Sequence, residues 1–317
     1  MGIRDMAKNE KKSLGTEEQL RKLKKRFRAA VAALALFAAM TGFFIYLNYD
    51  YLAFKFFMAY NYIYTDALDK LFARELKRDV KGKYFSYFDD AVISVFTKSI
   101  RDINLDRYTY LYTPENYKKY LREEKEEAAK SEIKVLDDKT VYLRLTNFSK
   151  YTASFVKENL KLLGKYPCII IDLRDNCGGD IDAMAEISDC FLPKESIIAV
   201  DKMRLFSRTY KAKKDRILAF ERIFILQNKN TASSSENMIA ALKDNLSNVT
   251  LIGEKTFGKG IGQYTLPLKR GFAVKATVLL WYTAKGVNIQ GNGIEPDIRY
   301  TGDDVLEFAL GRLADLL

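Results

Sequence analysis

The sequence predicts an α/β fold for residues 133–317, preceded by a helical region and one membrane-spanning helix. From residue 133 onward, segments of strand composition alternate with segments of helical periodicity, an order typical of layered α/β architectures. Cys168–Leu173 (CIIIDL) is an apolar run, as expected for a strand that is buried on both faces. With 317 residues and 48% hydrophobic content, the chain is large enough to bury a substantial core.

The elements of this domain are predicted in chain order from their periodicity. Strands alternate or run apolar over a few residues and are rich in β-branched side chains, whereas helices repeat apolar residues every three or four positions. The predicted strands are Thr140–Leu145, Cys168–Leu173, Ile223–Leu226, Val249–Ile252 and Phe272–Tyr282. The predicted helices are Ala153–Leu163, Asp180–Leu192 and Ser235–Asp244.

Residues 48–132 are rich in Lys, Glu and Tyr and are expected to be mostly helical. Thr113-Pro114-Glu115 has the composition of a helix start, because proline is favoured at the first helical position. We expect this region to pack on the α/β domain or on a partner. Two apolar stripes have helical spacing, namely Ala67, Leu68, Leu71 and Phe72, and then Val92, Ile93, Val95, Phe96 and Ile100.

Ala29–Leu47 contains nineteen residues without a charge, about the length that crosses the hydrocarbon core of a lipid bilayer. Residues 1–28 hold 10 Lys and Arg against 4 Asp and Glu. The positive-inside rule therefore predicts a single-pass membrane protein with a basic cytoplasmic tail and the domain outside the cytoplasm. A cleaved signal peptide is the alternative, since small residues surround Ala38 and Ala39, but the long basic lead-in favours an anchor.

The net charge of +11 does not indicate a nucleic-acid partner, because six of the excess positive charges precede residue 29 and no aromatic–basic clusters follow. The three cysteines lack the spacing of a zinc site or of a disulfide framework. Buried free thiols are favoured, while a Cys177–Cys190 bridge stays open for an oxidising compartment. No metal or cofactor is expected.

The chain has no histidine, so a nucleophilic serine would need an amine or a carboxylate as its base. Lys259 is the candidate amine. Gly253–Gly260 (GEKTFGKG) nearly matches the Walker A motif, but Gly260 stands at the position of its Ser/Thr. A Walker A loop also opens a helix, whereas the residues that follow here have strand composition. Glycines on both sides let the backbone of Lys259 approach its neighbours, and a dry pocket would lower the pKa of the amine. An exposed turn lysine is the alternative.

Ser233 begins a serine cluster that has a structural interpretation as well as a catalytic one. Ser233-Ser-Ser-Glu236 matches a helix capping box. A serine at a helix start can also have the next backbone N–H, that of Ser234, directed at a developing oxyanion. Asn176–Asp180 (NCGGD) is either a plain βα turn or a loop whose backbone amides supply a second oxyanion donor.

In their order along the chain, these segments resemble the C-terminal processing (tail-specific) peptidases, which are serine peptidases with a Ser–Lys dyad. The resemblance covers about residues 60–300 and implies a crotonase/ClpP-like core that cleaves peptide bonds near substrate C-termini. It implies Ser233 as nucleophile, Lys259 as general base and Gln263 as the residue that orients the amine. It also implies an oxyanion hole from the backbone amides of Gly178 or Gly179 and of Ser234. The matching stretches are DRYTYLYTPENYKKYL, IIDLRDNCGGDIDAMAEISDCFLP, NKNTASSSENMIAALKDN, LIGEKTFGKGIGQ and GVNIQGNGIEPDI.

The chain departs from this family in three places. Cys177 stands where the family usually has proline. The interval of 26 residues from Ser233 to Lys259 is one longer than expected, which leaves open which serine of the cluster attacks. Only about twenty residues separate Tyr120 from Val141, so the PDZ domain that usually grips the substrate tail does not fit between them.

We therefore expect a membrane-anchored serine endopeptidase that cleaves protein or peptide substrates with exposed C-terminal tails through an acyl-enzyme. The alternative is a catalytically silent crotonase-like binding module. A third hypothesis is a protease in which an activating partner or a second copy of the chain takes over the role of the missing PDZ domain. The intact set of Ser233, Lys259 and Gln263 favours the enzyme.

Overall fold

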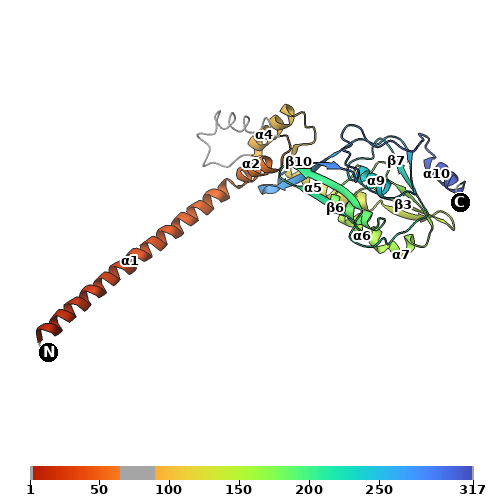
Figure 1. Ribbon diagram of the computed structural model, residues 1–317. Coiled ribbons are helices and arrows are strands. Elements are labelled where there is room, and N and C mark those ends of the chain that lie inside the picture. The colour runs from red at the N-terminus through yellow and green to blue at the C-terminus, as the bar shows by residue number, and fades with distance from the viewer. Residues whose placement is uncertain (1–2, 65–89, 316–317) are drawn as a thin grey trace.

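The computed structural model describes residues 3–64 and 90–315. The helices are α1 (Ile3–Leu47), α2 (Tyr49–Asn61), α4 (Asp90–Ile103), α5 (Pro114–Ala128), α6 (Lys150–Glu158), α7 (Leu160–Leu163), α8 (Ile181–Asp189), α9 (Ser234–Asn245), the 3-10 turn η2 (Lys269–Gly271) and α10 (Val305–Ala314). The strands are β1 (Tyr110–Tyr112), β2 (Glu132–Val135), β3 (Thr140–Arg144), β4 (Cys168–Asp172), β5 (Ile197–Met203), β6 (Ser207–Lys211), β7 (Arg222–Gln227), β8 (Val249–Gly253), β9 (Ile261–Pro267), β10 (Ala273–Tyr282) and β11 (Ile298–Arg299). Figure 1 shows α1 extending as a single rod from a body that contains all of these strands.

A six-stranded sheet in the order β11-β8-β7-β4-β3-β2 lies at the centre of the body. Its strands are parallel except for β2, which pairs antiparallel with β3 at one edge. All five residues of β4 are buried, which confirms the strand predicted from the apolar run. One face of the sheet packs against apolar residues of α6, α8 and α9, and the other packs against α10. The mixed α/β prediction is thereby confirmed.

A second, antiparallel sheet contains β1, β10, β5 and β6, with β9 also paired to β10. The long strand β10 carries the contacts to the N-terminal region. Phe54 and Met58 of α2 and Ile93 of α4 join Trp281 of β10 in one buried apolar cluster. Helices α2 and α4 therefore pack on the α/β domain, which was one of the two predicted alternatives for this region.

The predicted elements after residue 133 are present with shifted ends. The helix predicted over Ala153–Leu163 begins earlier, at Lys150, and is interrupted at Asn159. Its earlier start is due to Ser149, whose N–H donates to Thr152 Oγ1 while its own Oγ accepts the Thr152 N–H. Strands β1, β2, β5, β6 and β11 were not among the predicted elements. β1 and β11 have only three and two residues, too few to show a periodicity, and β6 is exposed at four of its five positions.

The two apolar stripes of the N-terminal region have different outcomes. The stripe from Val92 to Ile100 lies on α4, where Ile93, Phe96 and Ile100 are buried but Val95 is exposed. The stripe at residues 67–72 lies outside the described residues. Helix α5 begins at Pro114 with Thr113 as its N-cap, as predicted. It is followed after three residues by β2, so no domain is inserted between α5 and the sheet.

Helix α1 contains a segment, Gln19–Leu47, that is long and apolar enough to cross a membrane. Its side chains from residue 19 to residue 46 are exposed, so this segment is not a core helix of the described body. Length and composition fit an anchor and a signal sequence alike.

Candidate active site

One cleft collects all six site residues predicted from the sequence. It has a volume of about 1160 Å³ and is lined by Ser233, Ser234, Lys259, Gln263, Gly178 and Gly179. Gly178 and Ser233 follow the carboxyl ends of the parallel strands β4 and β7, which is where open α/β sheets usually place their sites. Strands β9 and β10 of the second sheet form the opposite wall.

The three serines at the start of α9 have different environments. Ser234 Oγ donates to Gly179 O at 2.9 Å, and the fully buried Ser235 Oγ donates to Asn176 O at 2.8 Å. Ser233 is partly exposed to the cleft and has φ of 58°, a conformation that costs a non-glycine residue energy and is found preferentially at functional sites. The tertiary structure therefore separates Ser233 from the two serines that follow it.

The buried carboxylate of Glu236 links the serine turn to the lysine loop. Its Oε2 accepts the backbone N–H of Ser233 at 2.8 Å and that of Lys259 at 2.9 Å. Its Oε1 accepts Thr256 Oγ1 at 2.6 Å and the N–H of Gly258 at 2.7 Å. Sequence reasoning assigned Glu236 to a capping box only. The fourfold acceptor role was missed because the lysine loop lies more than twenty residues further along the chain.

Lys259 directs its amine into the cleft just before β9. Its Nζ donates to Gln263 Oε1 at 2.8 Å and lies 5.2 Å from the centre of the Tyr108 ring, while its backbone O accepts Trp281 Nε1 at 2.9 Å. Burial, assisted by the positive charge of Lys275, lowers the pKa of Lys259 to about 8. The amine therefore has a substantial neutral fraction near neutral pH, which a general base requires.

The N-terminal region completes this wall of the cleft. Gln263 Nε2 donates to the backbone O of Tyr108. Tyr108 is held by Asp106, a buried side chain that accepts from the Tyr108 N–H at 3.0 Å, from Thr109 Oγ1 at 2.6 Å and from Thr277 Oγ1 at 3.1 Å. The segment DRYTYLY was one of the stretches that resemble the family, but its residues gave no indication that the backbone O of Tyr108 would accept a hydrogen bond from Gln263.

The glycine loop packs against the serine turn. A Cβ on Gly178, whose φ is 100°, would lie 2.8 Å from Ser233 Cβ, so only glycine fits there. The N–H of Gly178 donates to Asn176 Oδ1 at 2.9 Å. Among the residues that the structure describes, the N–H groups of Gly179 and Ser234 donate to no acceptor. Those two amides are therefore the ones free to bind an oxyanion.

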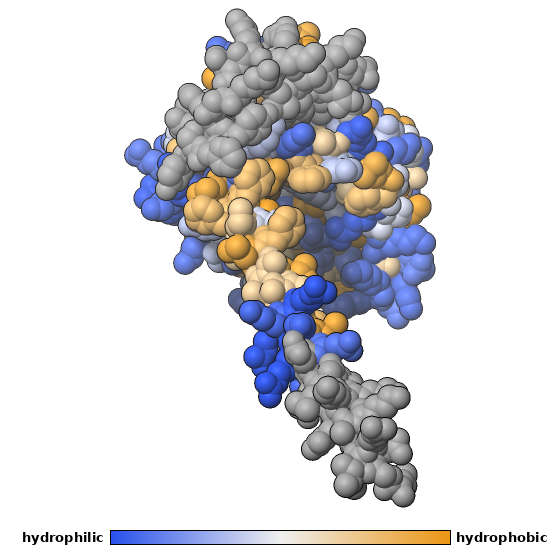
Figure 2. Space-filling model, turned by 90° about the vertical axis from the view of Figure 1, so that its left-hand side faces the viewer, coloured by the Kyte–Doolittle hydropathy of each residue, from blue (hydrophilic) through white to orange (hydrophobic). Residues whose placement is uncertain are grey.

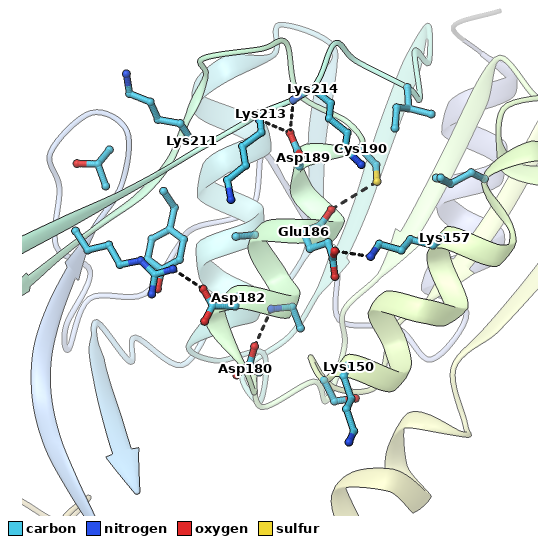
Figure 3. A pocket seen from close by; sticks show the side chains of 18 of the residues that line it. Lys150, Lys157, Asp180, Asp182, Glu186, Asp189, Cys190, Lys211, Lys213 and Lys214 are labelled. Atoms are coloured by element: carbon cyan, nitrogen blue, oxygen red, sulfur yellow. Dashed lines mark hydrogen bonds and ion pairs between the residues drawn. The ribbon is translucent and has the colours of Figure 1, made fainter.

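A second cavity of about 1060 Å³ adjoins the cleft and shares Glu124, Asp180 and Asp182 with it. Figure 3 shows Lys157 paired with Glu186 and the carboxylate of Asp189 turned toward Lys213 and Lys214, whose backbone N–H groups it accepts. None of the six predicted site residues lines this cavity. Two ion pairs lie within its lining, Lys157–Glu186 and Arg208–Asp182.

All three cysteines are free in the structure. Cys177 lies in the cleft and Cys190 lies in the second cavity, so the bridge that the sequence left open is not formed. Within residues 3–64 and 90–315, no group of three or more His, Cys, Asp or Glu side chains is arranged to hold a metal ion.

The family model of peptidase family S41 matches residues 139–300, about half of the chain. The chain belongs to peptidase family S41. A carboxy-terminal-processing protease of Bartonella bacilliformis is 35% identical over 184 residues, which cover 52% of this chain and 41% of that relative. The carboxy-terminal processing protease CtpA of Bacillus subtilis is 36% identical over 176 residues, covering 55% and 37%. The chain spans about two fifths of the length of these relatives, and the resemblance to C-terminal processing peptidases is confirmed.

Among solved structures, a lipoprotein from Streptococcus agalactiae superposes with a TM-score of 0.63 at 16% identity, covering 86% of this chain and 96% of that one. A solved structure named as a putative peptidase, from Parabacteroides merdae, superposes with a TM-score of 0.52 at 18% identity, covering 83% of this chain and 95% of that one. At such identities the likeness concerns the fold alone. The crotonase/ClpP-like character of the core stays a prediction.

Proposed function

We propose that this S41 chain is a serine endopeptidase that cuts protein substrates near their C-termini through a dyad of Ser233 and Lys259. The observation that carries the proposal is the Glu236 carboxylate, which holds the backbones of both residues with one oxygen. The strained Ser233 and the buried amine of Lys259 thereby face one cleft. A module that only binds has no need of a strained serine and a depressed lysine pKa in the same place.

In this mechanism the neutral amine of Lys259 takes the proton from Ser233 Oγ as the oxygen attacks the substrate carbonyl carbon. The N–H groups of Ser234 and Gly179 donate to the resulting oxyanion. Gly178, which the sequence offered as an alternative donor, has its N–H engaged by Asn176. The protonated Lys259 then gives its proton to the leaving amine nitrogen, which leaves the acyl group on Ser233.

Hydrolysis of the acyl-enzyme uses the same residues. The amine of Lys259, neutral again, removes a proton from a water molecule whose oxygen attacks the ester carbon, and the proton passes to Ser233 Oγ as the ester bond breaks. In the substrate-free chain the amine donates to Gln263 and not to Ser233. We expect the contact between Nζ and Oγ to tighten when a substrate is bound, as catalytic hydrogen bonds often do. An activating partner or a second copy of the chain could favour this change.

We propose further that α1 anchors the chain in a lipid bilayer with the body outside the cytoplasm. Figure 2 shows apolar side chains gathered where α1 meets the body. On the α2 surface Phe56 and Tyr60 are exposed, and so are Leu205 and Phe206 at the turn between β5 and β6. Arg204 donates to Ala59 O, so this turn lies against α2. Aromatic side chains next to a membrane-length helix suit the bilayer interface.

The dyad is tested by comparing full-length wild type in detergent with Ser233→Ala and Lys259→Ala. The substrate is an unfolded protein with a free C-terminal tail, and the products are identified by mass spectrometry. We expect each variant to lose at least ~1000-fold in cleavage rate. The matched controls Ser247→Ala and Lys255→Ala change exposed residues of the same types and should cleave at the wild-type rate. Equal cleavage by all five proteins would overturn the dyad.

The same assay separates the enzyme from its alternatives. Absence of cleavage by wild type, with or without lipid vesicles, would favour the silent module or a form that needs an activating partner. The anchor is tested by extracting membranes with alkaline carbonate, which should leave the full chain in the membrane pellet. Release of a chain that lacks α1 would identify the segment as a cleaved signal peptide.

A further inference from the structure

Two buried polar side chains line the catalytic cleft without hydrogen-bond partners. Asp201 is 0% exposed, and neither of its carboxylate oxygens has a partner. Asn237 is 1% exposed, and neither its amide nitrogen nor its amide oxygen has one. Both residues line the cleft that contains Ser233. A buried polar group without a partner is costly and rare, so two of them in one cleft point to a ligand that satisfies them.

Both groups are placed beside the proposed dyad. Asn237 follows Ser233 by four residues at the start of α9, which puts the two on the same side of the helix. Asp201 of β5 lies directly opposite Trp281 of β10, and residues opposite one another in an antiparallel pair share a face of the sheet. That face looks toward the dyad, because Trp281 Nε1 donates to Lys259 O at 2.9 Å.

The charged groups around Asp201 do not satisfy it. Arg208 of β6 lies opposite Asp201 in the register, but its guanidinium donates to Asp182 at 2.8 Å and lies 4.3 Å from the centre of the Tyr210 ring. Figure 3 shows Asp182 receiving this bond at the border of the second cavity. Burial raises the pKa of Asp201 to about 7, with Arg208 lowering it and Asp182 raising it. A second cation at this place would favour the ionised carboxylate.

The rest of the cleft is acidic although the chain as a whole carries a net charge of +11. The carboxylates that line it besides Asp201 are Glu123, Glu124, Glu126, Glu127, Asp180 and Asp182, whereas the cations are Lys130, Lys259 and Lys275. Its walls also contain Tyr264 and Trp281. Aromatic faces and carboxylates together suit a long cationic side chain, which has an apolar stem and a charged head.

We propose that Asp201 and Asn237 form the base of a subsite that binds a Lys or Arg side chain of the substrate beside the scissile bond. The inference rests on the proposed peptidase function and adds a substrate class to it: tails that carry a basic residue at the cleavage site. The stem of that residue packs along Leu279 and Trp281, which line the same cleft. Its head group donates to the Asp201 carboxylate and to Asn237 Oδ1.

Access to this base requires a small movement. Asp201 has no exposed surface in the substrate-free chain, so a side chain over it must turn aside. Tyr264 is half-buried in the cleft wall, and its pKa is raised first by burial and then by the charge of Asp201. An apolar substrate side chain would leave both base residues without partners, and the subsite would disfavour it by the cost of those unpaired groups. An acidic side chain would be repelled by the Asp201 carboxylate.

The subsite is tested by binding as well as by cleavage. Two fluorescent peptides, identical except for Lys or norleucine at one central position, are titrated against full-length Ser233→Ala. We expect the Lys peptide to bind at least tenfold more tightly. In Ser233→Ala with Asp201→Asn added, this ratio should fall below about two. A ratio near one in the first protein, or an unchanged ratio in the second, would overturn the subsite.

Two further variants control this experiment. Glu295→Gln removes an exposed carboxylate that pairs with Lys255 and does not line the cleft, and it should change the ratio less than twofold because the charge is screened. Asn237→Leu should lower the ratio by about threefold, and it serves as an independent variant if Asp201→Asn does not fold. Because binding does not need the dyad, this arm decides the subsite even if wild type cleaves nothing. Conversely, Ser233-dependent cleavage without a preference for basic residues would overturn the subsite and leave the peptidase function standing.

Discussion

The amine of Lys259 donates a 2.8 Å hydrogen bond to the side-chain oxygen of Gln263. The amide nitrogen of Gln263 donates in turn to the backbone carbonyl of Tyr108, so the orientation of the amide is set from the N-terminal region. Because an amide in this orientation can only accept from the amine, the proposed base is held in place without adding a negative charge beside it. The pKa of Lys259 can therefore stay low.

Replacing Gln263→Glu should shift the pH dependence of cleavage to higher pH. A carboxylate within hydrogen-bond distance favours the charged amine and should raise the Lys259 pKa by roughly 1–3 units. The measurement is kcat/KM against pH from 6 to 11. The control is Gln290→Glu, since a carboxylate there can still accept the Gly260 N–H that Gln290 accepts at 2.8 Å. The control should leave the midpoint unchanged, and an equal shift in both variants would speak against a local effect on Lys259.

The wild-type enzyme should itself show a pH profile governed by Lys259. Its pKa of about 8 predicts that kcat/KM rises roughly tenfold per pH unit below 8 and levels off above it. Lys275→Gln should move the midpoint upward, because the charge of Lys275 contributes to the lowered pKa. A midpoint that does not respond to this change would indicate that another group is titrating.

Lys259→Met should stabilise the fold at neutral pH while abolishing activity. The folded-state pKa of Lys259 lies near 8, below the ordinary value of 10.5, so the unfolded chain binds the proton more tightly. The charged amine thus destabilises the fold fully below pH 8, by up to ~3 kcal/mol, and this cost fades as pH rises from 8 to 10.5. Urea unfolding of both proteins at pH 7 and pH 10.5 measures the difference. A stability gain that is the same at both pH values would contradict this explanation.

Glu236→Gln should damage both activity and stability. Each carboxylate oxygen of Glu236 accepts two hydrogen bonds. In the variant one of these oxygens becomes an NH₂ group, which cannot accept, so in either orientation of the amide the hydrogen bonds to that position are lost. We expect a loss of about 2–5 kcal/mol in the free energy of unfolding and at least ~100-fold in kcat, because the serine and lysine backbones lose their common acceptor. Glu295→Gln, at an exposed ion pair with Lys255, should change stability by less than about 0.5 kcal/mol. A fall in stability without a fall in kcat would leave Glu236 a purely structural role.

Much of the fold could be predicted because its signals are local. The buried strand Cys168–Asp172 and the helix after Thr113 follow from apolar runs and capping residues within a few positions. Strands β5 and β6 pair with each other across a short turn, but β6 (SRTYK) is largely polar and exposed, so it offered no apolar repeat from which the pair could be predicted. The break at Asn159, whose side-chain amide donates to Phe155 O at 2.8 Å, is not revealed by the apolar periodicity of the segment.

The sequence by itself determined the family and most elements of the central sheet, because motifs and apolar runs are strings of neighbouring residues that need no tertiary information. It also supplied the candidates Ser233, Lys259 and Gln263, and the absence of histidine made the lysine the natural base. Only the tertiary structure distinguished Ser233 from the two serines that follow it. The hydroxyls of Ser234 and Ser235 are engaged by carbonyls more than fifty residues away, and no local pattern encodes such contacts. The position of Asp201 in the cleft could not be predicted locally either, because it depends on how the two sheets pack against each other.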